Sequence, residues 1–231
     1  MNEGNISTIL GLKGIPSIAE EMMVDRDISL CEYTNSRFHL SYLSTQNSIK
    51  KIKLDKEKGL SITTDVSLYN LFLTEDYIEN FDTRYKTMPP LRTKKDTKSL
   101  IDALNKGIID VISSDHNPQT EENKKIEFDN AKDGIIGLET AFGILGKYIL
   151  PKTTLNKLIE VIAINPREVL QLPQSNIKEG EKANITLFDP TMEWVFTEKN
   201  IKSKSKNTPF IGETLIGKAL AIYNNGRFKE C

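Results

Sequence analysis

The hydrophobic pattern of the chain alternates short apolar runs with longer amphipathic stretches up to about residue 170. Apolar runs bounded by turn residues predict strands at residues 37–44, 60–66 and 108–112. Apolar residues at helical spacing predict helices at residues 17–33, 45–58, 93–106, 135–149, 154–164 and 165–170, with a short one from Thr74. In the first of these helices the expected apolar stripe is Ile18, Met22, Ile28 and Leu30. Such alternation of strands and helices is typical of a parallel α/β sheet.

The pattern changes after Pro173. Residues 179–189, 193–197 and 219–223 are expected to be strands, and Asn224-Asn-Gly226 a tight turn. We therefore expect two parts, residues 1–172 and residues 173–231. The lysine-rich stretch at residues 202–206 is interpreted as a solvated loop rather than a nucleic-acid patch.

Composition narrows the class of protein. With 31 basic and 32 acidic residues, the net charge of −1 gives no field that would attract nucleic acid or an anionic membrane. An apolar content of 38% with 27% charged residues is typical of a globular protein. No apolar run approaches the roughly 20 residues that span a bilayer, and the start has no signal-peptide pattern. Two cysteines provide no disulfide framework. A cytoplasmic location is expected, with neither nucleic acid nor membrane as partner.

The run at residues 108–112 stops at Asp115-His-Asn-Pro118. In barrels of alternating strands and helices, the carboxyl ends of the strands carry the chemistry, so Asp115 and His116 are candidate site residues. The alternative is an ordinary Asx turn after a strand, fixed by Pro118. The spacing alone is compatible with either interpretation.

The wider context carries a resemblance. Asp115-His-Asn-Pro-Gln-Thr120 is followed by Gly134-Ile-Ile-Gly-Leu-Glu-Thr140, and three other matching stretches are Met1–Gly4, Gly14–Pro16 and Lys206–Phe210. Together they resemble the dihydroorotases, zinc-dependent cyclic amidohydrolases of pyrimidine biosynthesis, over nearly the whole chain. The resemblance implies an α/β fold. Residues 1–172 would form the C-terminal half of an amidohydrolase-type (β/α)8 barrel, with strands 5–8 and their helices, and residues 173–231 part of a small β-sandwich. A full barrel takes about 250 residues. The 231 residues are therefore expected to be a fragment, a truncated copy or the partner of another chain.

The resemblance also assigns site residues. Asp115 matches the family's catalytic acid/base and metal ligand. Substrate-binding positions correspond to His116, Gln119, Met88, Asp133 and Gly134. Two of these depart from the family pattern, because Met88 stands where the family has Asn, and Gln119 stands where it has a second His. Asp115 itself is expected to serve chiefly as a strand-ending residue that caps backbone N–H groups.

The metal ligands of the family are largely replaced. The chain holds only two histidines, His39 and His116, and Tyr42, Tyr69 and Asn70 occupy ligand positions. A phenol and a neutral amide are poor zinc ligands. The family uses zinc, but for this chain we expect no cofactor and no bound metal. Asp115 is the one family ligand that survives. His39 matches a non-ligand histidine, and a structural or surface role is expected for it.

Three functions follow from the resemblance. The first is a catalytically impaired or inactive dihydroorotase homologue that acts as a structural or partner subunit, with aspartate carbamoyltransferase as the partner suggested by inactive members of the family. An oligomer or partner chain is expected, since unpaired sheet edges recruit other chains. The second is an active dihydroorotase, interconverting N-carbamoyl-aspartate and dihydroorotate, completed by upstream residues. The third, a hydantoinase or allantoinase, needs the same missing histidines.

Overall fold

The computed structural model describes residues 1–231, and these fall into two compact units. Unit 1 comprises residues 1–138 and 201–209, and unit 2 comprises residues 139–200 and 210–231. The expected boundary between residues 172 and 173 coincides with none of the three breaks in the chain, because the helices of residues 139–169 pack with the C-terminal strands in unit 2. The assignment of residues 1–172 to a barrel part and 173–231 to a sandwich part stays a prediction.

The centre of unit 1 is a parallel sheet of three strands in the order β1-β2-β3. The strands are β1 (Phe38–Leu40), β2 (Ile62–Ser67) and β3 (Val111–Ser113). Phe38 pairs with Ile62, and Asp65 pairs with Val111. The three predicted strands are thus present, although β1 and β3 are short. Burial of nearly all of β2 is expected for the middle strand of a parallel sheet.

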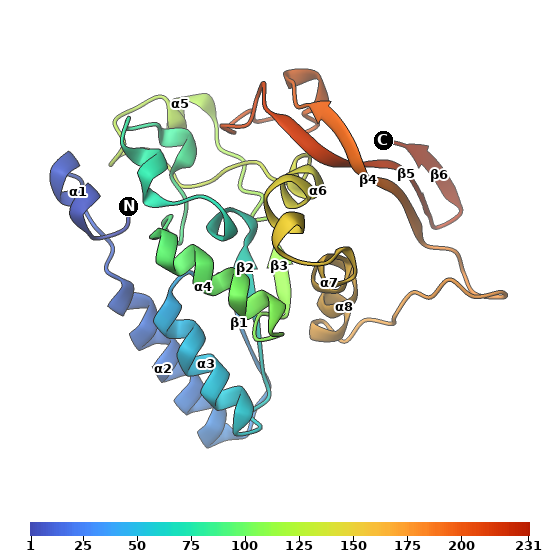
Figure 1. Ribbon diagram of the computed structural model, residues 1–231, viewed down its shortest axis with the longest axis horizontal. Coiled ribbons are helices and arrows are strands. Elements are labelled where there is room, and N and C mark those ends of the chain that lie inside the picture. The colour runs from blue at the N-terminus through green and yellow to red at the C-terminus, as the bar shows by residue number, and fades with distance from the viewer. The chain divides into compact units, whose positions relative to one another are not determined.

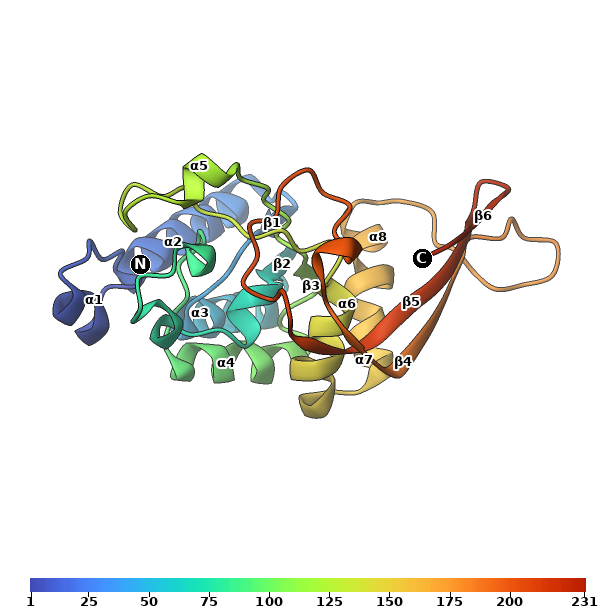
Figure 2. The same ribbon diagram turned by 90° about the horizontal axis from the view of Figure 1, so that it is seen from above.

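Three long helices lie side by side in unit 1: α2 (Ser17–Thr34), α3 (Gln46–Glu57) and α4 (Lys94–Asn105) (Figure 1). Figure 2 shows the same row from above, with α2 at one end. Thr45 begins α3 as predicted, since its hydroxyl accepts a hydrogen bond from the N–H of Ser48. Thr93 and Asp96 form a reciprocal capping box at the start of α4. The shorter helices of this unit are α1 (Asn5–Leu10), α5 (Glu121–Lys124) and the 3₁₀ turns Leu68–Leu71, Glu75–Ile78 and Thr83–Tyr85.

The predicted apolar stripe of α2 is largely wrong. Ile28 is buried, but Ile18, Met22 and Leu30 are exposed. The buried face is instead made by Glu21, Val24, Ile28 and Cys31. Two carboxylates explain why the buried face differs from the predicted one. Glu20 accepts hydrogen bonds from Ser44 and Thr45, and Glu21 accepts one from Asn47, all beside the start of α3.

Unit 2 combines a helical stretch with an antiparallel sheet in the order β4-β5-β6. The strands are β4 (Ile185–Val195), β5 (Thr214–Asn224) and β6 (Arg227–Glu230). Asn225 and Gly226 both have positive φ, of 50° and 75°, as a type I′ hairpin turn requires. The predicted strands 179–189 and 193–197 form a single irregular strand, and β6 was not predicted. The helical elements are α6 (Ala141–Ile144), α7 (Leu155–Ile159), α8 (Asn165–Val169), the π-helical stretches Leu145–Ile149 and Glu160–Ile164, and the 3₁₀ turns Leu150–Lys152 and Glu198–Asn200.

The helix predicted at residues 135–149 begins only at Ala141. Residues 135–138 are held extended instead. Ile135 forms a parallel bridge with His116, and the N–H of Ile136 donates to the carbonyl of Asn207.

None of the helices in the structure is both long enough and apolar enough to cross a membrane.

Candidate functional site

Five of the sequence-predicted residues lie at or just after the carboxyl ends of β1, β2 and β3 in unit 1. We call this the strand-end site. Its residues are Tyr42, Asp65, Tyr69, Asn70, Asp115 and His116. Parallel strands bring such positions to one edge because their carboxyl ends point the same way. Asp65 was not among the predicted residues.

Asp65 connects the first two strands. One oxygen of its carboxylate accepts a hydrogen bond from the N–H of Tyr42 at 2.8 Å, and the other lies 3.1 Å from Nε2 of His39. Nδ1 of His39 lies 2.8 Å from the hydroxyl of Thr63. Both ring nitrogens of His39 are therefore engaged between β1 and β2, which agrees with a structural histidine. Tyr42, with φ of 58°, follows this link in a left-handed conformation.

Asp115 faces β2 and is half-buried. Its Oδ2 accepts a hydrogen bond from the hydroxyl of Ser67 at 2.9 Å, and its backbone has φ of 47°. Burial raises the pKa of Asp115 to about 6, with a further increase from the negative charge of Asp65, while the Ser67 bond opposes the rise. The expectation that this carboxylate caps backbone N–H groups is wrong, because the left-handed backbone turns it toward β2.

His116 is fixed in one orientation. Its Nδ1 accepts hydrogen bonds from the N–H groups of Gly137 at 3.1 Å and Leu138 at 3.3 Å. A neutral ring in this setting carries its proton on Nε2. A Cβ at position 137 would lie 2.4 Å from the carbonyl oxygen of Ser114 and 2.6 Å from the hydroxyl of Tyr69. Glycine is thus required there by close approach rather than by backbone angle.

The loop after His116 is held by Asn207, which sequence reasoning did not single out. Nδ2 of Asn207 donates to the carbonyls of Asn117 and Gly134, at 3.0 and 3.1 Å. Its Oδ1 accepts from the N–H of Gln119 at 3.0 Å. Gln119 and Gly134 are thereby brought together. A signal was available, since Lys206–Phe210 carried part of the family resemblance without an assigned role.

The remaining substrate positions are less closely tied to the site. The carbonyl of Asp133 accepts a hydrogen bond from Nδ2 of Asn117 at 3.2 Å. Met88 is exposed and precedes a cis peptide bond to Pro89. The substrate-binding roles of His116, Gln119, Met88, Asp133 and Gly134 remain predictions.

Two lysines also organise this loop. The buried ammonium of Lys124 donates to the carbonyls of Lys132 and Gly134, at 2.9 and 3.1 Å. Burial lowers the pKa of Lys124 to about 8. The ammonium of Lys86 donates to the carbonyls of residues 128, 129 and 131. Both cations act here on backbone oxygens.

The side chains at the replaced ligand positions have other partners. The hydroxyl of the fully buried Tyr69 donates to the carbonyl of Ile136 at 3.1 Å. Nδ2 of Asn70 donates to the carbonyl of Pro90 at 3.2 Å, while its buried Oδ1 has no partner. No three His, Cys, Asp or Glu side chains come together in a way that would hold a metal ion. Catalytic zinc usually takes three protein ligands, so the residues present do not fit it.

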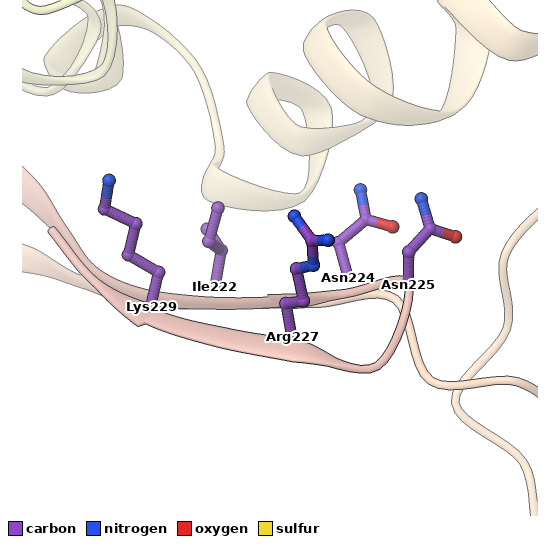
Figure 3. Close-up of a pocket in the computed structure, with 5 residues that line it drawn as sticks. All are labelled: Ile222, Asn224, Asn225, Arg227 and Lys229. Carbon is purple, nitrogen blue, oxygen red and sulfur yellow. The ribbon is translucent and has the colours of Figure 1, made fainter.

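Unit 2 contains a separate hollow of about 500 Å³ on the β5–β6 hairpin (Figure 3). It is lined by Ile222, Asn224, Asn225, Arg227 and Lys229. The lining includes no carboxylate, histidine or cysteine. Its ionisable side chains are the cations Arg227 and Lys229, so it holds no pair of an acid and a base of the usual carboxylate or histidine type.

Comparison with known proteins gives consistent results. Residues 18–214 match the model of the amidohydrolase family. The dihydroorotase of Caldicellulosiruptor saccharolyticus is 41% identical over 229 residues, which is 98% of this chain and 53% of that protein. The dihydroorotase of Thermoanaerobacter sp. is 45% identical over 219 residues, 94% of this chain and 51% of that protein. The predicted resemblance to dihydroorotases is confirmed, and the chain spans about half the length of these curated relatives.

Solved structures confirm the type of fold. The dihydropyrimidinase of Brevibacillus agri superposes with a TM-score of 0.81 at 24% identity, covering 92% of this chain and 49% of that one. The inactive dihydroorotase-like domain of the Chaetomium thermophilum CAD-like multifunctional protein gives 0.66 at 24% identity, covering 87% and 53%. The shared architecture is that of a partial (β/α) barrel.

Proposed function

Because the chain belongs to the amidohydrolase family, we propose that it is a dihydroorotase-like protein of pyrimidine biosynthesis whose own residues bind no catalytic zinc. In this proposal the strand-end site is structural, and the chain acts as a supporting or partner subunit. The β-sandwich character of residues 173–231 belongs to the same proposal, since unit 2 holds the three-stranded sheet from which such a layer would be built.

The hydrogen bond from Tyr69 to Ile136 carries the proposal. Tyr69 stands where the resemblance places a metal-binding histidine, yet its hydroxyl joins the end of β2 to the segment that cradles His116. A buried carbonyl left without a donor costs about 1–3 kcal/mol. The tyrosine therefore holds the end of β2 and the segment around Ile136 together by an ordinary hydrogen bond, at the position where the family would use a metal.

Zinc content tests the proposal directly. The purified 231-residue chain is dialysed and analysed for metals beside the Caldicellulosiruptor dihydroorotase, which is treated identically. We expect no stoichiometric zinc in this chain and no conversion of N-carbamoyl-aspartate to dihydroorotate. One or more zinc ions per chain after dialysis would contradict the proposal. A variant with Tyr42→His, Tyr69→His and Asn70→His, checked for folding by circular dichroism, measures whether these positions alone account for the difference.

A partner chain completes the proposal. The multifunctional protein whose inactive dihydroorotase-like domain shares this fold offers a precedent for such a domain in a larger assembly. We propose aspartate carbamoyltransferase as the partner. Size-exclusion chromatography of the two purified proteins from the same source should show co-elution, and independent elution at micromolar concentration would refute this assignment.

The geometry of Asp115 supports a second candidate, an active dihydroorotase completed by residues outside 1–231. A carboxyl group with a pKa near 6 is suited to proton transfer near neutral pH, and Nε2–H of His116 remains available to donate a hydrogen bond. If dihydroorotate hydrolysis is measurable in a longer protein and vanishes in Asp115→Asn without loss of stability, this candidate replaces the first.

A further inference from the structure

The β5–β6 hairpin of unit 2 gathers its cations on one face. In the register of the hairpin, Ile222 lies opposite Lys229, and Asn224 lies opposite Arg227. Because side chains alternate along a strand, these four lie on the same face, which borders the hollow of unit 2. Figure 3 shows them rising from the same side of the hairpin, together with Asn225 of the turn. The hairpin thus places two cations and two amides around one hollow.

The two cations of this face have no anionic partner in the structure. Arg227 and Lys229 are exposed, and neither side chain forms an ion pair or a hydrogen bond. The carboxylate of Glu230 belongs to the opposite face, since Glu230 pairs with Ala221. One unpaired cation is ordinary on a protein surface, but two cations beside a hollow without a carboxylate in its lining create a local positive potential. That potential favours an anion in the hollow.

A third lysine acts on the turn of the hairpin. The ammonium of Lys182 donates to Oδ1 of Asn225 at 3.2 Å. Because the oxygen of this amide is engaged, its Nδ2 remains as a free donor. In Figure 3 the nitrogen atoms of Arg227, Lys229 and Asn225 lie at the free ends of their side chains. The hollow therefore offers several N–H donors, as a group with several acceptor oxygens requires.

A phosphate group fits these donors better than a carboxylate does. A phosphate monoester carries about −1.5 to −2 charges on three acceptor oxygens at neutral pH, and it can thus engage both cations. A guanidinium binds two such oxygens at once, while an ammonium acts as a point charge. The volume of about 500 Å³ lies in the range that holds a small organic molecule. Ile222 provides an apolar contact for the carbon part of such a molecule.

We propose that the hollow on the β5–β6 hairpin binds a small phosphate monoester, with Arg227 and Lys229 on its phosphate group. This inference does not depend on the proposed function, because all the residues involved belong to unit 2. A nucleic acid is a less suitable occupant. Proteins that bind nucleic acid through its backbone commonly contact about 6–10 phosphates, whereas this face has two free cations on a chain with a net charge of −1.

Titration of the isotope-labelled chain with phenyl phosphate, followed by NMR, tests the class of ligand. We expect the amide signals of residues 222–229 to shift with a Kd of about 0.1–1 mM. Benzoate, which has the same ring and a single charge, should bind at least about tenfold more weakly. No shift of these signals up to about 10 mM phenyl phosphate, or equal binding of benzoate, would overturn the proposal. Tighter binding of a short single-stranded oligonucleotide would replace it with a nucleic-acid site.

Charge-removing substitutions test the residues. Arg227→Gln and Lys229→Gln should each raise the Kd by about tenfold, and at exposed positions they should leave the fold intact. The matched control is Lys199→Gln, at an exposed lysine that follows β4 near the start of β5, at the far end of the sheet from the hairpin. It removes the same charge and should change the Kd by less than about twofold. Affinity that survives both hairpin substitutions, or that falls equally in Lys199→Gln, would refute the site.

The same titration in a longer protein that contains this chain tests whether the hollow is open there. We expect phenyl phosphate to bind with a similar Kd and the same dependence on Arg227. Loss of binding in the longer protein would show that another segment fills the hollow, and it would overturn the proposal.

Discussion

The substitution Asp115→Asn should make the protein more stable at neutral pH. The folded state holds the carboxyl of Asp115 at a pKa of about 6, against an ordinary value of 3.8. Between these values the folded protein binds more protons than the unfolded chain, so the free energy of unfolding falls as pH rises from about 4 to 6. The free energy of unfolding continues to fall through pH 6, and the loss is nearly complete at about pH 7. Asparagine cannot ionise and still accepts the hydrogen bond from Ser67.

The size of the effect follows from the shift. A difference of about two pKa units, at 1.36 kcal/mol each, changes the free energy of unfolding by about 3 kcal/mol. Because the carboxyl is partly exposed to solvent, we take about 2 kcal/mol as the lower bound. The stability advantage of Asp115→Asn over the wild type should therefore be about 2–3 kcal/mol larger at pH 7 than at pH 4.

Urea unfolding followed by circular dichroism at several pH values measures this difference. The carboxyl-carbon chemical shift of Asp115 reports its pKa directly by NMR. Asp189→Asn is a control whose effect on stability should change with pH in the opposite direction. Backbone N–H groups of Thr191 and Met192 lower the pKa of that exposed carboxyl. A titration midpoint of Asp115 below about pH 5, or a stability gap that does not change with pH, would refute the reasoning.

Three further predictions concern the same unit. Tyr69→Phe should lower the free energy of unfolding by about 1–3 kcal/mol in urea melts, because the carbonyl of Ile136 loses its donor, whereas Tyr77→Phe at an exposed ring should change it by less than about 0.5 kcal/mol. Gly137→Ala should lower the melting temperature by several degrees, since its Cβ would meet backbone at 2.4 Å; an unchanged melting temperature would contradict the required close approach. A lysine whose pKa is lowered to about 8 in the folded state makes the free energy of unfolding rise between pH 8 and 10.5. Lys124→Met should abolish this rise and also leave two carbonyls without a donor, and urea melts across that pH range measure both effects.

The order of elements was predictable from the sequence because each carries its own signal. Thr45 and Thr93 begin α3 and α4 as their side chains suggest. Apolar runs mark β2 and β3. The hairpin after β5 follows from Asn225-Gly226, which tolerate the positive φ of its turn. These signals are local, so a single sequence contains them.

What failed depends on contacts between distant residues. The helix expected from residue 135 starts late because His116 and Asn207 hold residues 135 and 136 extended. The inner face of α2 was misassigned because the half-buried carboxylate of Glu20 and the buried carboxylate of Glu21 displace an apolar stripe that its spacing favours. Within the site, the partnership of His39 with Asp65 was missed, since alternation along one strand says nothing of its neighbour.

The dependence of the loop on Asn207 has a consequence for the order of folding during synthesis. The amide of Asn207 reaches residues 73 to 90 positions earlier in the chain, so the ribosome must have synthesised the chain as far as residue 207 before these bonds can form. The strands and helices of unit 1 that precede residue 106 can assemble first, while the segment from Asn117 to Gly134 waits. A chain released before residue 207 would carry Asp115 and His116 on a loop without its anchor, and that loop would be the first part of the protein exposed to proteases.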